Sequence, residues 1–199
     1  MVKNILVVGV GGQGVIMASD MLADVALASG FAAKKSEVHG MSQRGGVVSS
    51  HVRYGAQVHA PLIGKCQADI LLAFELAEAV RWLDFLAPHG QAIVNGHKLV
   101  PPLVTMGLAK YPDNAAQTLM QRSRNPQIVE ASALAVRLGN LRLVNTILLG
   151  VASRYLDLAD DKWANVINER IKLPLQELNH QAFQAGRELQ QFDKRCTII

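Results

Sequence analysis

The apolar residues at the start of the chain predict a buried strand followed by an amphipathic helix. Residues 5–8 form an unbroken apolar run with Val10 just beyond it, and a glycine-rich turn follows. Apolar residues then recur at helical spacing on one face. These are Val15, Ala18, Met21, Leu22, Val25 and Ala26. A strand, a turn and a helix in this order are typical of α/β proteins.

The same periodicity places further strands and helices in alternation along the chain. Strands are predicted at residues 31–35, 47–61, 68–74, 91–95 and 127–130, with a hairpin turn at residues 54–56. Helices are predicted at residues 75–87, 112–123, 132–138 and 141–156. A further helix is predicted to be capped by Asp160 and Asp161, and a last one to begin at Leu175. This alternation predicts an α/β, Rossmann-like fold with a mostly parallel sheet, helices on both faces and a helical C-terminal region.

Composition favours a single globular domain over residues 1–199. Half of the residues are apolar and 18% are charged, which argues against intrinsic disorder. The longest unbroken apolar run has five residues, 70–74, whereas a bilayer span needs about 20. Because no leader signature precedes the glycine-rich turn, we interpret the chain as a cytoplasmic protein without a membrane segment.

Charge and cysteine content narrow the partners and cofactors that we expect. The net charge of +4 is spread along the chain without a basic cluster, which argues against nucleic acid as a partner. Cys66 and Cys196 are far apart and form no CxxC motif, so this chain alone is not expected to hold an iron–sulfur cluster. The histidines lack metal-ligand spacing, and we expect no metal site.

The glycine-rich turn is the first candidate site. Gly9, Gly11, Gly12, Gln13 and Gly14 fit the pattern G-x-G-x-x-G between a strand and a helix, where backbone N–H groups attract a phosphate. The acidic residue that would bind a ribose is not evident, because Lys34 and Lys35 end the next predicted strand and Glu37 follows them. The alternative is that the glycines only allow close packing of the strand and the helix.

A second polar, glycine-rich loop is the other candidate site. It contains Glu37, Gly40, Met41, Ser42, Gln43, Arg44, Gly45 and Gly46. The Arg44 guanidinium could bind a carboxylate, a phosphate or carbonyls of a partner. Alternatively, Arg44 pairs with Glu37 inside the fold and Met41 packs in the core. Together with Lys34, Lys35 and Arg53, Arg44 also suggests a binding module for an acidic metabolite.

Two asparagines are weaker candidates, and no catalytic residue is evident. Asn95 ends a predicted strand at the carboxyl edge of the sheet, where α/β proteins bind ligands. Asn145 lies on an apolar helix face, where its amide would need a partner. The sequence contains no nucleophile elbow, no GxxxxGK[ST] loop and no GDG diphosphate motif. Catalytic residues and metal ligands are therefore not expected in this chain.

Three motifs in order resemble a known family. They are GVGGQGV at residues 9–15, EVHGMSQRGGVVSSHVR at residues 37–53 and LGNLRLVNTILLG at residues 138–150. Together they resemble the gamma-type domain of 2-oxoacid:ferredoxin oxidoreductases over nearly the whole chain. The MSQRGG string is most similar to the beta subunit of the indolepyruvate branch. His39 and Met41 stand where the pyruvate-type string YGPEMRGG has Tyr and Glu.

The resemblance implies a subunit that is not active alone. A large partner subunit would carry thiamine diphosphate, magnesium and iron–sulfur clusters, and the complex would convert a 2-oxoacid such as indolepyruvate or another arylpyruvate into an acyl-coenzyme A. Electrons would pass to ferredoxin. The loop around Arg44 would shape the coenzyme A side of the active site, and the chain would occur in an oligomer. An independent NAD(P)- or flavin-binding oxidoreductase and an acidic-metabolite module remain as alternatives.

Overall fold

The computed structural model describes residues 1–39, 46–100, 104, 107 and 110–189, and it is built around a six-stranded sheet. The order of the strands across the sheet is β2-β3-β1-β4-β5-β6. Their bounds are β1 Lys3–Val10, β2 Ala32–His39, β3 Val47–Gly55, β4 Ala68–Ala73, β5 Leu86–Asn95 and β6 Gln127–Val129.

The sheet is parallel on one side of β1 and antiparallel on the other. β1 pairs in parallel with β4, β4 with β5, and β5 with β6. β3 runs antiparallel to both β1 and β2 and lies between them, so that Val7 is paired with Ser50 on one side and with Leu72 on the other. The expectation of a mostly parallel sheet with helices on both faces is confirmed.

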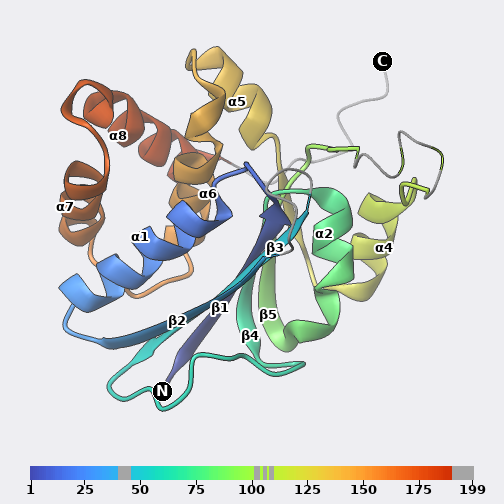
Figure 1. Ribbon diagram of the computed structural model, residues 1–199, viewed down its shortest axis with the longest axis horizontal. Coiled ribbons are helices and arrows are strands. Elements are labelled where there is room, and N and C mark those ends of the chain that lie inside the picture. The colour runs from blue at the N-terminus through green and yellow to red at the C-terminus, as the bar shows by residue number, and fades with distance from the viewer. Residues whose placement is uncertain (40–45, 101–103, 105–106, 108–109, 190–199) are drawn as a thin grey trace.

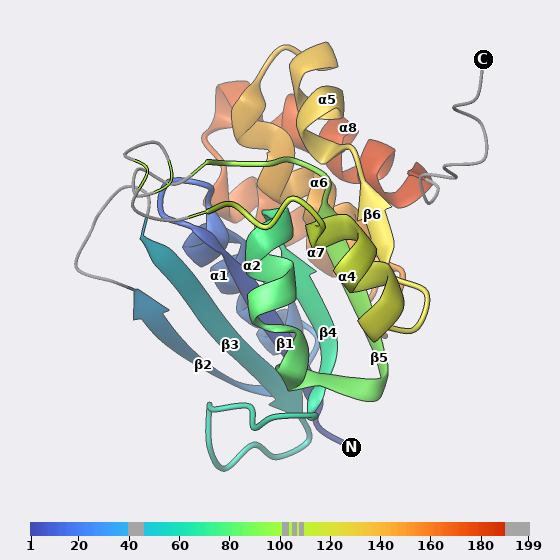
Figure 2. The same cartoon turned by 90° about the vertical axis from the view of Figure 1, so that its right-hand side faces the viewer.

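Helices cover both faces of the sheet (Figures 1 and 2). One layer holds α1 (Val15–Ala28), α6 (Val144–Ser153), α7 (Asp160–Arg170) and α8 (Leu173–Glu188), and α5 (Ala131–Arg137) packs against α6. The other layer holds α2 (Leu76–Arg81) and α4 (Ala115–Arg122). The helical C-terminal region is thus part of one layer.

The side-chain alternation of β1 builds both halves of the core. Ile5 and Val7 pack into the cluster beneath α1 and α6, while Leu6 and Val8 pack into the cluster beneath α2 and α4. All four side chains are fully buried. A strand that is buried on both faces shows a continuous apolar run, which is why residues 5–8 do not alternate with polar ones.

The predicted hairpin at residues 54–56 is wrong. β3 ends at Gly55, and residues 56–67 form an irregular segment that leads to β4. Side chains of β3 hold this segment: the Arg53 guanidinium donates to the carbonyls of Ala60 (2.9 Å) and Leu62 (3.1 Å), and His51 Nδ1 accepts from the Ile63 N–H (3.1 Å). β3 pairs with β1 and β2, which come earlier in the chain, and not with the residues that follow it.

The predicted helix at residues 75–87 is too long. α2 ends at Arg81, a 3-10 turn follows at Leu83–Phe85, and β5 already begins at Leu86. Pro88 lacks the N–H that a continued helix would offer to the Asp84 carbonyl. That carbonyl accepts from the Cys66 N–H instead, at 3.0 Å.

Other element boundaries also differ from the sequence-based expectation. β2 extends to His39, so that Glu37 belongs to a strand and not to a loop. The predicted helix at residues 141–156 opens with a 3-10 turn, Leu141–Leu143. α7 has Ala159 as its N-cap, with Asp160 and Asp161 in its first turn, and α8 begins at Leu173. Acidic side chains in a first turn still interact favourably with the helix dipole.

Candidate functional site

A cavity of about 730 Å³ lies beside the glycine-rich turn, at the carboxyl ends of β1 and β5. Its walls come from the turn before α1, the end of β5, the starts of α5 and α6, and the junction of α7 and α8. The cavity is rich in carboxamides and in side chains of the basic residue types. These are Gln13, Asn95, Asn140, Asn145, Asn179, His97, Arg142, Arg170 and Lys172. Such a lining suits a polar, anionic ligand.

The glycine-rich turn is held by its own glutamine. Gln13 Oε1 accepts from the Val10 N–H (2.8 Å), and Gln13 Nε2 donates to the Phe74 carbonyl (3.3 Å). A Cβ on Gly9 would lie 2.9 Å from the Phe74 Cβ, which is too close for any side chain. Gln13 and Gly9 therefore tie the turn to the end of β4, in keeping with the packing alternative.

Asn95 fixes the start of α5 to the end of β5. Its side chain is 1% exposed; Nδ2 donates to the Ser132 Oγ (2.9 Å) and to the Phe74 carbonyl (3.3 Å). Oδ1 accepts from the Ser132 N–H (3.3 Å). Asn95 lies at the carboxyl end of its strand and lines the cavity, while its role as a ligand-binding residue stays a prediction.

The tertiary structure brings the three sequence motifs together. The Gly11 N–H donates to the Gly46 carbonyl (2.8 Å), which joins the first motif to the end of the second. The third motif arrives from α6: a Cβ on Gly14 would lie 3.2 Å from Asn145 Nδ2. Residues 40–45 of the second motif, which are Gly40, Met41, Ser42, Gln43, Arg44 and Gly45, lie outside the described residues.

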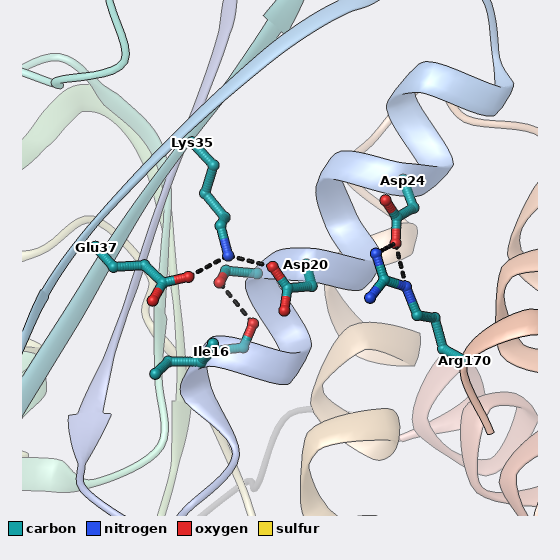
Figure 3. Close-up of polar contacts among 7 residues, drawn as sticks. Ile16, Asp20, Asp24, Lys35, Glu37 and Arg170 are labelled. Atoms are coloured by element: carbon teal, nitrogen blue, oxygen red, sulfur yellow. Dashed lines mark hydrogen bonds and ion pairs between the residues drawn. The ribbon is translucent and has the colours of Figure 1, made fainter. Parts of the chain in front are cut away.

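Ion pairs hold α1 on two sides (Figure 3). The Lys35 ammonium of β2 contacts the carboxylates of Asp20 and Glu37, and Arg170 of α7 contacts Asp24, with Nε at 2.6 Å. Burial lowers the pKa of Lys35, but the two carboxylates outweigh this effect, so that its pKa is raised and the ammonium stays charged. These contacts fix the helix that follows the glycine-rich turn.

Of the described cations proposed for an acidic-metabolite module, Lys35 and Arg53 already bind other groups of the protein. Lys35 is paired with Asp20 and Glu37, and Arg53 binds Asn4 Oδ1 (2.8 Å) and backbone carbonyls near the end of β3. Glu37 has Lys35 as an ionic partner. The cavity instead contains Arg142, Arg170 and Lys172, which we did not single out from the sequence. The sequence signal for Arg142 was its place in the LGNLRLVN string, and the signal for Arg170 and Lys172 was their place at the junction of α7 and α8.

A second polar cluster surrounds the start of α2, and sequence reasoning missed it. Glu75 is 1% exposed; its carboxylate accepts from the N–H groups of Glu78 (3.0 Å) and Leu99 (3.3 Å) and from the Tyr111 hydroxyl. Glu78 is also buried, and burial raises its pKa. The signal was an acidic residue directly before a helical pattern, which is a favourable N-terminal position. This cluster anchors both ends of the segment between β5 and α4.

The sheet differs from that of a dinucleotide-binding protein. In the Rossmann order, the strand after the first helix lies directly beside β1. Here β3 separates β2 from β1. The end of β2, where a ribose-binding carboxylate would be sought, is therefore one strand further from the glycine-rich turn. In addition, the Gly11 N–H is already bonded to Gly46.

The described part of the chain contains neither a cluster of metal ligands nor a membrane-spanning helix. Among its His, Cys, Asp and Glu residues, no group of three or more is arranged to hold a metal ion. No helix within the same residues is long and apolar enough to cross a bilayer.

Comparisons with known proteins agree on one family. Residues 4–189 match the family model described as pyruvate ferredoxin/flavodoxin oxidoreductase. The chain is 38% identical over 187 residues to the indolepyruvate oxidoreductase subunit IorB of Archaeoglobus fulgidus, covering 92% of each chain. It is 33% identical to the IorB subunit of Thermococcus kodakarensis, covering 92% of this chain and 93% of that protein.

Solved structures of low identity share the fold. The gamma subunit of a keto/oxoacid ferredoxin oxidoreductase from Geobacter sulfurreducens has a TM-score of 0.68 at 22% identity, covering 92% of this chain and 95% of that one. A 2-oxoglutarate:ferredoxin oxidoreductase from Magnetococcus marinus has a TM-score of 0.72 at 18% identity, covering 97% of this chain and 32% of that one. With its three motifs at one edge of the sheet and close relatives along nearly its whole length, the chain belongs to the pyruvate ferredoxin/flavodoxin oxidoreductase family.

Proposed function

We propose that this chain is a subunit of an indolepyruvate-type 2-oxoacid:ferredoxin oxidoreductase. The observation that carries the proposal is the 38% identity to an indolepyruvate oxidoreductase subunit over 92% of both chains. In this reaction the bond between the carboxylate and the keto carbon of indolepyruvate, or of a related arylpyruvate, breaks and carbon dioxide leaves. The keto carbon is oxidised by two electrons, which go to ferredoxin. The sulfur of coenzyme A bonds to that carbon and releases its proton.

The cofactors of this reaction belong, in our proposal, to a larger partner subunit. Thiamine diphosphate with magnesium supplies the decarboxylation chemistry, and iron–sulfur clusters carry the electrons. The described residues of this chain contain no group of metal ligands that fits either magnesium or a cluster. We therefore assign this chain no step through them, and its role is to complete the assembly in the cytoplasm and to bind the co-substrate.

We further infer that the cavity beside the glycine-rich turn binds coenzyme A. Arg142 and Lys172 supply positive charge for its phosphates, and the first N–H groups of α1 add donors without intrahelical partners. The structure of the Magnetococcus marinus relative was determined with coenzyme A bound. We propose that Arg44 also contributes to binding coenzyme A, because it belongs to the second motif and lies close to Gly46 in the sequence.

Reconstitution tests the subunit assignment. The chain is co-expressed with a candidate thiamine-dependent large subunit from the same organism, and indolepyruvate-dependent reduction of ferredoxin is measured with and without this chain. We expect the two chains to co-purify and the activity to require both. Full activity of the large subunit alone would overturn the proposal, as would turnover of an oxoacid by this chain alone.

Removal of the cavity cations tests the coenzyme A site. In the complex, the double substitution Arg142→Ala and Lys172→Ala should raise the KM for coenzyme A by about tenfold or more, because two charge-assisted contacts are lost. The KM for indolepyruvate should not change. Lys162→Ala, on α7 and outside the cavity lining, is the matched control. An unchanged KM for coenzyme A in the double variant would overturn the proposal that the cavity binds coenzyme A.

A further inference from the structure

Asn145 is the buried carboxamide where the first and third motifs meet. It lies in the first turn of α6, lines the cavity and is 6% exposed. Gly14 packs directly against it, since a Cβ on Gly14 would lie 3.2 Å from Asn145 Nδ2. Gly14 thus leaves room for an asparagine from a helix about 130 residues further along the chain.

The orientation of the Asn145 amide follows from its neighbours. The N–H of Thr146 points at one amide atom at 2.9 Å. A backbone N–H can only donate, so that atom is the oxygen Oδ1. The amide nitrogen must then point the opposite way, toward the glycine-rich turn and α1.

The amide nitrogen has only a weak partner there. In the described part of the chain, Nδ2 reaches the thioether sulfur of Met17 at 3.4 Å. A carboxamide carries two N–H protons, and a thioether is a weak acceptor for one of them. Buried polar groups normally have a full hydrogen-bond partner. At a cavity wall, a ligand oxygen would be such a partner.

The helix that carries Asn145 is locked to α8 at the same level. The Thr146 hydroxyl bonds Asn179 Oδ1 at 2.6 Å, and Asn179 Nδ2 donates to the Leu175 carbonyl at 2.8 Å. A hydroxyl has a single proton to donate, and the short distance shows that Thr146 donates it to Asn179 Oδ1. The backbone N–H of Thr146 therefore holds Asn145, while its hydroxyl holds α6 against α8. The start of α6 is therefore fixed before any ligand arrives.

We propose that Asn145 is a ligand-binding residue, which donates its amide N–H to an oxygen of coenzyme A, and that Thr146 and Asn179 position it. This inference rests on the proposed function of the cavity. It assigns the third motif a direct contact with the co-substrate in addition to its part in the fold.

Asn145→Asp separates binding from structure. A carboxylate keeps an oxygen for the Thr146 N–H and suits the first turn of a helix, but it cannot donate to a ligand and it repels phosphate. In the complex of this chain with its large subunit, the KM for coenzyme A should rise about tenfold or more, while kcat at saturating coenzyme A and the melting temperature stay near those of the wild type. Asn168→Asp introduces the same charge on an exposed position of α7 and is the matched control.

The outcomes distinguish this inference from the proposed function. If Asn145→Asp binds coenzyme A like the wild type while Arg142→Ala with Lys172→Ala weakens binding, the cavity binds coenzyme A and the role of Asn145 is overturned. If neither variant changes the KM, the proposed site itself fails, and this inference fails with it. Should Asn145→Asp not assemble, Asn145→Ala removes the amide N–H without adding another side-chain donor, and the same comparison applies.

The positioning role has its own readout. Thr146→Val removes the hydroxyl that bonds Asn179, and Thr146→Ser keeps it. We expect the valine variant to raise the KM for coenzyme A severalfold at unchanged kcat, and the serine variant to restore it. Ser153→Ala removes another buried hydroxyl from the same helix, away from the cavity, and should lower stability without changing the KM. An equal rise of the KM in Ser153→Ala would show that the effect is only one of stability.

Discussion

At the scale of single residues, one carbonyl group organises the carboxyl edge of the sheet. The Phe74 carbonyl accepts from Gln13 and from Asn95, and Asn95 also binds Ser132. The end of β4, the glycine-rich turn and the start of α5 are thereby joined. The sequence identified Gln13 and Asn95 as candidates from their places after strands. It could not show that their side chains bind backbone, because that depends on which strands are neighbours.

His51 gives a prediction about pH at this scale. The ring is buried, burial lowers its pKa below the ordinary 6.5, and its Nδ1 accepts from the Ile63 N–H. Between the lowered pKa and 6.5 the unfolded chain binds more protons, so the contribution of His51 to the free energy of unfolding is lost as the pH falls through this window. His51→Gln should cost about 1–2 kcal/mol at pH 7.5, and its difference from the wild type should shrink as the pH falls below 6.5.

Urea unfolding at pH 7.5, 6.5 and 5.5 measures this difference. His59→Gln, at an exposed position, is the control with which the pH dependence of His51→Gln is compared. Glu78 contributes with the opposite sign, because its raised pKa favours the folded state as the pH falls, but it is common to both proteins and cancels in the difference. A difference that is independent of pH would contradict the assignment of His51.

At the scale of elements, the close crossing of α6 and α8 builds one wall of the cavity. A Cβ on Gly150 would collide with the Phe183 carbonyl oxygen, and a Cβ on Gly186 would collide with that of Ile147. The two helices therefore approach through backbone at both glycines. The sequence predicts an apolar stripe on this helix, and Ile147, Leu148 and Val151 are buried as expected. Tyr155, expected on the same stripe, is 37% exposed and lies beyond the end of α6. That α8 packs on this stripe was not predictable, because a helical period shows which face of a helix is buried but not which element packs against it.

Gly150→Ala should be destabilising, although alanine is the better helix former. In an exposed helix the change would stabilise by about 1 kcal/mol, whereas here the new Cβ meets fixed backbone, and overpacking should cost about 2 kcal/mol or more. Thermal and urea unfolding of the isolated chain measure the effect. Gln184→Ala, on the exposed side of α8, should change stability little. A gain of stability in Gly150→Ala would show that α6 and α8 do not cross at these glycines.

At the scale of the whole molecule, the sheet order sets which segments share the functional edge. The local patterns predicted most strands and helices, but β3 was given a hairpin of its own and instead separates β2 from β1. Strand order depends on pairing between distant segments, and the period of a single strand contains no information about it. The expectations of one domain and of an oligomeric assembly stay predictions.

The isolated chain should expose apolar surface near the cavity. Leu173 is 80% exposed and Leu141 is 62% exposed, and Leu141 and Leu175 line the cavity. A subunit without its partner leaves such contact surface uncovered. We expect the isolated chain to self-associate in light scattering and to bind a hydrophobic dye, and the complex to do so less. Leu173→Ser should reduce both signals; a strictly monomeric chain without dye binding would contradict this.

The sequence by itself determined most of the strands and helices of this protein, because hydrophobic periods and glycine positions act locally. It determined that β1 is buried on both faces, that a helix follows the glycine-rich turn, and through its three motifs, the family. Only the tertiary structure decided that Gly11 meets Gly46, that Gly14 meets Asn145, and that Arg142 and Lys172 line one cavity. Those contacts join residues far apart in the chain, and they form only when strand pairing and helix crossing bring the segments together.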